Sequence, residues 1–111
     1  MPAYIVAHRQ QVTDTDGLKK YDHVDASIEK FGGEVVIRAD SFDVLEGDWR
    51  PGRKMDDAHP ERITIIRFPD MAALRRWYDS PDYSELKHIR QQCSKSDVIA
   101  VEATAAMSSG R

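Results

Sequence analysis

The sequence has little cysteine, no long apolar run and no excess of positive charge. Cys93 is the only cysteine among 111 residues, so one chain can form neither an internal disulfide nor a cysteine-based zinc site. No apolar stretch approaches the ~18 residues needed to cross a bilayer, and the start MPAYIVAHRQ lacks the charged region and apolar run of a secretory signal. We therefore expect a cytoplasmic protein with no membrane partner, in which Cys93 is a buried structural thiol.

The net charge and the motifs that are missing narrow the function further. A formal net charge of -3 is unusual for a nucleic-acid-binding protein, which carries a basic surface, so we expect no nucleic-acid partner. No glycine-rich phosphate loop, Gly-x-Ser-x-Gly elbow or His-Glu-x-x-His helix is present. His59 lies near Asp56 and Asp57, but these residues lack the spacing of a metal site. We predict neither a metal nor a cofactor.

Four short apolar runs are the main fold signal: Tyr4-Ile5-Val6-Ala7, Val35-Val36-Ile37, Ile63-Thr64-Ile65-Ile66 and Val98-Ile99-Ala100-Val101. Each is apolar on both faces, which is typical of strands in a sheet that is covered twice. The intervening sequence offers two helical regions, enough to cover one face only. We therefore predict a homodimer in which sheet packs against sheet, with an enclosed space between the sheets as the seat of function.

The first helical region begins at a cap provided by Asp14 or Thr15 and ends at Gly32-Gly33. We predict a positive φ at Gly33, with Gly32 able to share this role. The apolar stripe of this helix follows a spacing of three and four, and comprises Leu18, Tyr21, Val24 or Asp25, Ile28 and Phe31.

The second helical region opens after Pro69-Asp70 and is interrupted at Asp79-Ser80-Pro81. Ser80 as cap and Pro81 as the first helical residue restart a helix that runs to about Cys93. The resulting order βαββαβ predicts an α+β, ferredoxin-like fold with an antiparallel sheet and both helices on one face.

The segments between these elements are less regular. A turn at Asp40-Ser41 and the alternation in 42–46 make a hairpin with the preceding strand plausible. Residues 48–61 form a long charged loop that contains Trp49. We expect one domain over 1–103 and a C-terminal tail over 104–111.

Several motifs together resemble those of the DUF1330 family, a domain of unknown function. They are Tyr21, Phe31-Gly32-Gly33, Arg38, Leu45-Glu46-Gly47, Glu61-Arg62, Phe68-Pro69, Trp77-Tyr78-Asp79-Ser80-Pro81-Asp82-Tyr83 and Arg90. The run Trp-Tyr-x-Ser-x-x-Tyr is the most specific of these. The resemblance implies the dimeric α/β-barrel superfamily, in which two ferredoxin-like subunits pack sheet to sheet. That superfamily includes isomerases and monooxygenases that work without a cofactor.

The long cations Arg38 and Arg62 lie in otherwise apolar strands, so they are candidates for binding a carboxylate or phenolate of a ligand inside the barrel. The alternative is an ion pair with Glu46 or Glu61. We predict a small-organic-acid site between the sheet and the helix break, because an apolar enclosure with a few polar groups is typical of small-molecule sites. Its expected lining is drawn from His8, Tyr21, Arg38, Arg62, Trp77 and Tyr83, with Trp49 near its mouth.

Each of these residues also has a structural interpretation. Trp77 is expected in the core, and Tyr83 is balanced between a structural hydrogen bond and the pocket. His8 is either a general base or a solvated strand-end residue. Three functions remain open: a cofactor-independent enzyme acting on a small organic acid, a dimer that binds or senses a small ligand, and a structural dimer.

Overall fold

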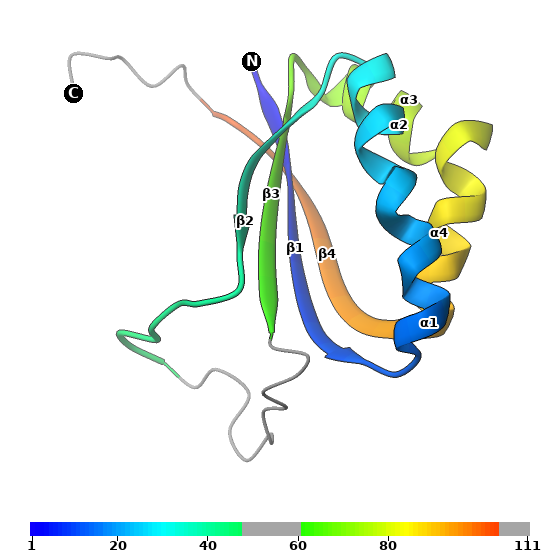
Figure 1. The fold of residues 1–111 in the computed structure, drawn as a ribbon. Helices are drawn as coiled ribbons and strands as arrows, with labels where there is room; N and C mark the ends of the chain where they lie inside the picture. The colour runs from blue at the N-terminus through cyan, green and yellow to red at the C-terminus, as the bar shows by residue number, and fades with distance from the viewer. Residues whose placement is uncertain (48–60, 105–111) are drawn as a thin grey trace.

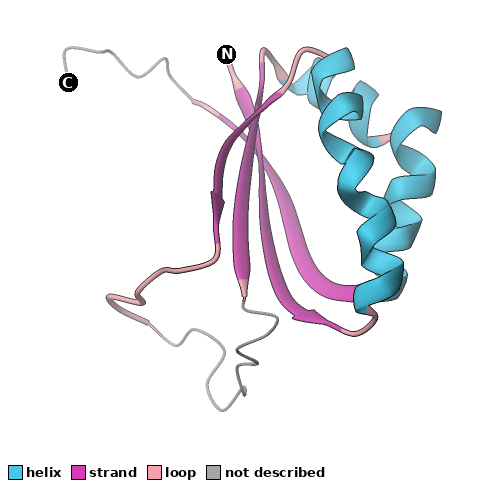
Figure 2. Ribbon diagram, viewed as in Figure 1, coloured by secondary structure: helices cyan, strands magenta, loops and turns pink. Residues whose placement is uncertain are grey.

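The computed structural model describes residues 1–47 and 61–104, which form a four-stranded antiparallel sheet with helices packed against one face (Figure 1). Figure 2 shows the same two layers, strands in one and helices in the other. The strands are β1 (Ala3–Val12), β2 (Glu34–Ala39), β3 (Arg62–Phe68) and β4 (Ser94–Glu102). The helices are α1 (Thr15–Leu18), the 3-10 helix η1 (Lys19–His23), α2 (Val24–Lys30), α3 (Met71–Tyr78) and α4 (Pro81–Cys93).

The strand order β2-β3-β1-β4 and the βαββαβ sequence of elements make the fold ferredoxin-like, as predicted. Side chains alternate between the two faces, and Ile5 and Ile66 are buried beneath the helices. On the other face, one row of paired apolar residues crosses all four strands: Ile37, Ile65, Val6 and Ile99.

The first helical region is divided into α1, η1 and α2 rather than forming one helix. Asp14 is its cap, because its side chain accepts a hydrogen bond from the backbone N–H of Gly17 at 3.0 Å. The region ends at Gly32, which has φ +84°, so the prediction of a positive φ at Gly33 is wrong. Gly33 is required for space instead, since a Cβ there would lie 2.6 Å from Phe68 and 2.8 Å from Ile28.

The second helical region breaks where the sequence predicts. Ser80 has extended backbone and its hydroxyl accepts a hydrogen bond from the backbone N–H of Tyr83 at 3.1 Å, while Pro81 opens α4. The Ser80 hydroxyl also donates to the carbonyl of Trp77 at 2.7 Å. The hydroxyl of one serine is thus hydrogen-bonded both to the end of α3 and to the start of α4.

The predicted hairpin after β2 does not form, because residues 41–45 contain no strand and β2 pairs with β3. Of the alternating residues, Phe42 packs its ring edge-on against His8 instead, with ring centroids 6.5 Å apart. Val44 and Leu45 are exposed. A period of two alone does not choose between a strand partner and an irregular segment.

The core lies between the sheet and the helices and is centred on Trp77, which is 1% exposed. Phe68, Ile28 and Leu74 are the other largest fully buried side chains. Cys93 is also buried. None of the helices in the described part of the chain has the length and apolar character required to cross a bilayer.

Candidate functional site

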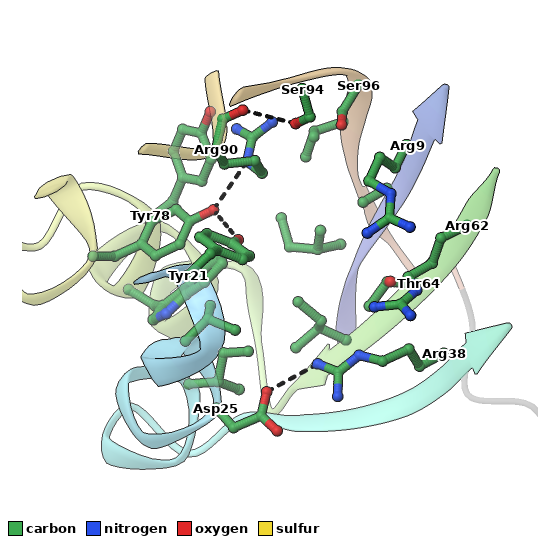
Figure 3. Close-up of a pocket in the computed structure, with 18 of the residues that line it drawn as sticks. Arg9, Tyr21, Asp25, Arg38, Arg62, Thr64, Tyr78, Arg90, Ser94 and Ser96 are labelled. Carbon is green, nitrogen blue, oxygen red and sulfur yellow. Dashed lines mark hydrogen bonds and ion pairs between the residues drawn. The ribbon is translucent and has the colours of Figure 1, made fainter. Parts of the chain in front are cut away.

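A cavity of about 290 Å³ lies between the sheet and the helices (Figure 3). Its apolar wall comes from β1, β3, α2 and β4, through Ile5, Ala7, Ile66, Ile28 and Val98. The complete lining includes side chains from all nine helices and strands of the described chain, which converge on one space. Such an enclosure, apolar with a few polar groups, is the usual form of a small-molecule site.

Five of the seven residues that the sequence singled out line this cavity: Tyr21, Arg38, Arg62, Trp77 and Tyr83. Their role in ligand binding stays a prediction. His8 does not join them, because strand alternation places it with Tyr4 and Val6 on the opposite face, where it hydrogen-bonds to Glu61. Trp49, His59, Asp56 and Asp57 lie outside the described residues.

Four aromatic rings form the wall at the helix break. Trp77 stacks on Tyr83 with ring centroids 4.0 Å apart, and its indole N–H donates to the Ser27 hydroxyl at 3.0 Å. Tyr83 is buried, whereas Tyr21 from η1 and Tyr78 from α3 are partly exposed. Tyr83 is packed in the core and also lines the cavity.

A chain of hydrogen bonds joins this wall to a cation. Arg90 Nε donates to the Tyr83 hydroxyl at 3.4 Å, and the hydroxyls of Tyr83 and Tyr21 are 2.7 Å apart. Guanidinium can only donate, so the Tyr83 oxygen accepts from Arg90. If the Tyr83 proton goes to the oxygen of Tyr21, the Tyr21 proton is left to donate toward the cavity.

Burial and neighbouring side chains determine the charge states of Tyr21 and Arg90 in this hydrogen-bonded chain. Burial first, and then the adjacent Tyr83, raise the pKa of the Tyr21 phenol well above its ordinary value, so Tyr21 is a neutral donor and no base. Burial lowers the pKa of Arg90, but the neighbouring phenols of Tyr83, Tyr21 and Tyr78 outweigh it and leave that pKa raised. Arg90 therefore carries its charge at the cavity wall.

Three further arginines reach the cavity from the strands: Arg9, Arg38 and Arg62 (Figure 3). Arg38 pairs with Asp25 of α2 at 2.9 Å, and Arg62 makes two hydrogen bonds with Asp40, at 2.6 and 3.1 Å. Asp25 and Asp40 thus pair with these arginines, and the sequence analysis named neither of them as a partner. Asp25 meets Arg38 because α2 crosses over β2, a contact between elements that sequence spacing does not show.

The DUF1330 family, described as a domain of unknown function, matches residues 2–104. The chain belongs to this family. No curated protein matches the sequence.

Solved structures with the same fold are distant in sequence. The methylated RPA0582 protein is 20% identical with a TM-score of 0.65, over 96% of this chain and 84% of that one. The RPA0582 protein of unknown function from Rhodopseudomonas palustris is 21% identical with a TM-score of 0.62, over 94% and 83%. SnoaB, a cofactor-independent oxygenase from Streptomyces nogalater, is 11% identical with a TM-score of 0.59, over 96% of each chain. These likenesses show the fold.

Two arginines that line the cavity, Arg9 and Arg90, were not among the predicted site residues. Arg9 shares its strand face with Ile5 and Ala7, so the alternation that excluded His8 would have placed it in the cavity. Arg90 lies seven residues after Tyr83, on the same side of α4, and that spacing was visible in the sequence. What the sequence did not reveal was that this side faces a cavity.

Proposed function

We propose that this protein binds a small organic acid in the cavity between the sheet and the helices, with Arg90 and Tyr21 receiving the acid group. The observation that carries the proposal is the state of Arg90. Among the side chains that the structure describes, no carboxylate pairs with its guanidinium, which donates a hydrogen bond to the Tyr83 hydroxyl. A half-buried cation without a counter-ion is a strong site for a carboxylate, because a charge-assisted hydrogen bond would offset its lost hydration.

The size of the cavity limits the ligand. An engineered apolar cavity of about 150 Å³ holds benzene, and this one measures about 290 Å³. A single ring with substituents, or an aliphatic chain of similar bulk, fits such a volume. The apolar wall favours the carbon skeleton, and the Arg90 end favours its acid group.

We further propose that the protein works as a homodimer that packs the second face of the sheet against that of another copy. The row of Ile37, Ile65, Val6 and Ile99 crosses this face, and Ile37 is 44% and Ile99 56% exposed. An apolar row that crosses all four strands is complementary to the same row of a second copy related by a two-fold axis. The cavity lies on the other side of the sheet, within one chain.

Binding can be tested by calorimetry with benzoate and hexanoate, each compared with the alcohol of the same skeleton. We expect the acids to bind and the alcohols to bind at least about tenfold more weakly, since only the acids can form the charge-assisted bond to Arg90. Arg90→Gln should remove this preference. Arg75→Gln, at an exposed position of α3, is the matched control and should keep it. Equal binding of acids and alcohols to the wild type would disprove the proposal.

A catalytic role without a cofactor is the second candidate, and it is supported by the neutral phenol of Tyr21. A donor held by Tyr83 and Arg90 would stabilise negative charge that develops on a ligand oxygen. The test is to recover the acid bound during expression and to follow its conversion by mass spectrometry. Tyr21→Phe should abolish conversion while the acid still binds; an acid recovered unchanged after prolonged incubation with wild-type protein leaves only the binding role.

A further inference from the structure

A single hydroxyl, that of Thr64, interrupts the apolar run Ile63-Thr64-Ile65-Ile66 of β3. Strand alternation places the half-buried Thr64 side chain with Ile66 on the face that the helices cover, where it lines the cavity. Valine has nearly the same shape and would bury more apolar surface at this position. A hydroxyl taken out of water costs free energy unless a hydrogen bond offsets its lost hydration.

The protein itself supplies no such hydrogen bond. None of the side chains that the structure describes is hydrogen-bonded to the Thr64 hydroxyl. Its cross-strand neighbours are Ala7 on β1, which has no polar side chain, and Arg38 on β2, which donates to Asp25. The Thr64 hydroxyl is therefore left to donate or accept a hydrogen bond with an occupant of the cavity.

Thr64 lies across the space from the groups that receive the acid. Figure 3 shows Thr64 on the strand side of the cavity, with Tyr21 and Arg90 on the helix side. Ala7 and Val98 form an apolar floor beside Thr64, because Ala7 is the cross-strand partner of both. The proposed function uses the helix side for the acid group and the apolar floor for the carbon skeleton, and leaves the Thr64 hydroxyl unused.

We propose that the ligand is a hydroxy acid whose acid group binds Arg90 and Tyr21 and whose hydroxyl exchanges a hydrogen bond with Thr64. This inference rests on the proposed function and adds the second, uncharged oxygen. A hydroxyl matches Thr64 because each of the two groups can both donate and accept. A ligand with a methyl group in that place would leave the Thr64 hydroxyl desolvated without a partner, which a site of this kind disfavours.

The test compares 4-hydroxybenzoate with 4-methylbenzoate, an acid of nearly the same size and shape, by calorimetry on the full chain at neutral pH. The corresponding 3-substituted acids form a second pair, in which the oxygen is nearer the acid group. Burial alone favours the methyl compounds, which are the more hydrophobic. We expect at least one hydroxybenzoate to bind about fivefold or more tightly than its methyl partner, because only the hydroxyl bonds to Thr64.

Variants assign the ligand hydroxyl to its partner. In Thr64→Val, whose new side chain suits a strand, the preference should reverse, while Thr64→Ser should keep most of it. Thr13→Val, at an exposed position outside the cavity lining, is the matched control and should keep the preference fully. Ser96 also lines the cavity, so a preference that is lost in Ser96→Ala and kept in Thr64→Val would overturn the assignment to Thr64.

The outcomes also separate this inference from the proposed function. If the methyl and hydroxy acids bind equally well, the second oxygen is wrong and the organic-acid site remains. If none of the four acids binds, both fail.

Discussion

The hydroxyl oxygens of Tyr21 and Tyr83 lie 2.7 Å apart although 62 positions separate the two residues in the sequence. Tyr83 also stacks on Trp77, the largest fully buried side chain in the described chain. The wall of the cavity is therefore continuous with the core, and its polar groups are held by packing. Such support limits the movement of Tyr21 and Arg90, which is the condition for a preorganised anion site.

Tyr21 should ionise only at a pH well above the ordinary tyrosine pKa of about 10. Burial and the contact with Tyr83 raise the pKa of its phenol in the folded state. A raised pKa stabilises the fold fully below the ordinary tyrosine pKa of about 10, and this contribution is lost as the pH rises above it. The ultraviolet absorbance of tyrosinate should show one late step, which Tyr21→Phe removes.

The matched control for this titration is Tyr4→Phe, on the opposite face of the sheet, which should leave the late step in place. Unfolding in urea at increasing pH gives a second measure. Above pH ~10 the free energy of unfolding should fall more steeply for the wild type than for Tyr21→Phe. Equal slopes would show that the Tyr21 phenol ionises normally.

Ser27→Ala should destabilise the fold by about 1–3 kcal/mol, because it leaves the indole N–H of Trp77 buried without an acceptor. That N–H donates to the Ser27 hydroxyl at 3.0 Å, and both residues are buried. Urea unfolding measures the change. Ser84→Ala, at an exposed position of α4, is the control; a loss no larger than in this control would rule out a role for the hydrogen bond.

Gly33→Ala should cost about 1–3 kcal/mol through overpacking, since the added Cβ would meet the fully buried Phe68 and Ile28. Gly32→Ala should cost about 1 kcal/mol for a different reason, its positive φ. Gly47 has a φ of +94° and open space around it, so Gly47→Ala isolates the cost of the backbone. If Gly33→Ala is no worse than Gly47→Ala in urea unfolding, the close packing at Gly33 is not rigid.

The fold was predictable from the sequence because its signals are local. Ser80-Pro81 marks the break between α3 and α4 by the chemistry of one cap, and the apolar runs mark the strands. Gly32-Gly33 marked the helix end, but the division of roles between them was wrong. The choice depends on which glycine faces Phe68, and that is a tertiary contact.

The candidate site was predictable only in part, for the same reason. Residue type alone suggested Arg38 and Arg62. Strand alternation would have selected Arg9 in place of His8, but only if it had been known which face of the sheet the helices cover. The pairing of Arg38 with Asp25 and of Tyr21 with Tyr83 depends on how the helices cross the sheet. No periodicity in one segment encodes the angle at which another segment packs on it.

The last prediction concerns the second face of the sheet, where Ile99 is 56% exposed at one edge and Ile37 is 44% exposed at the other. If two copies pack through this face, Ile99→Lys should separate them, because each copy would bury a charge against an apolar partner. The fold of one chain should survive, since the position is exposed within it. Light scattering at micromolar concentration should give a dimer for the wild type and for Ala26→Lys on the exposed side of α2, and a monomer for Ile99→Lys. A wild type that stays monomeric and folded would disprove the dimer and leave the proposed ligand site intact, because that cavity is built within one chain.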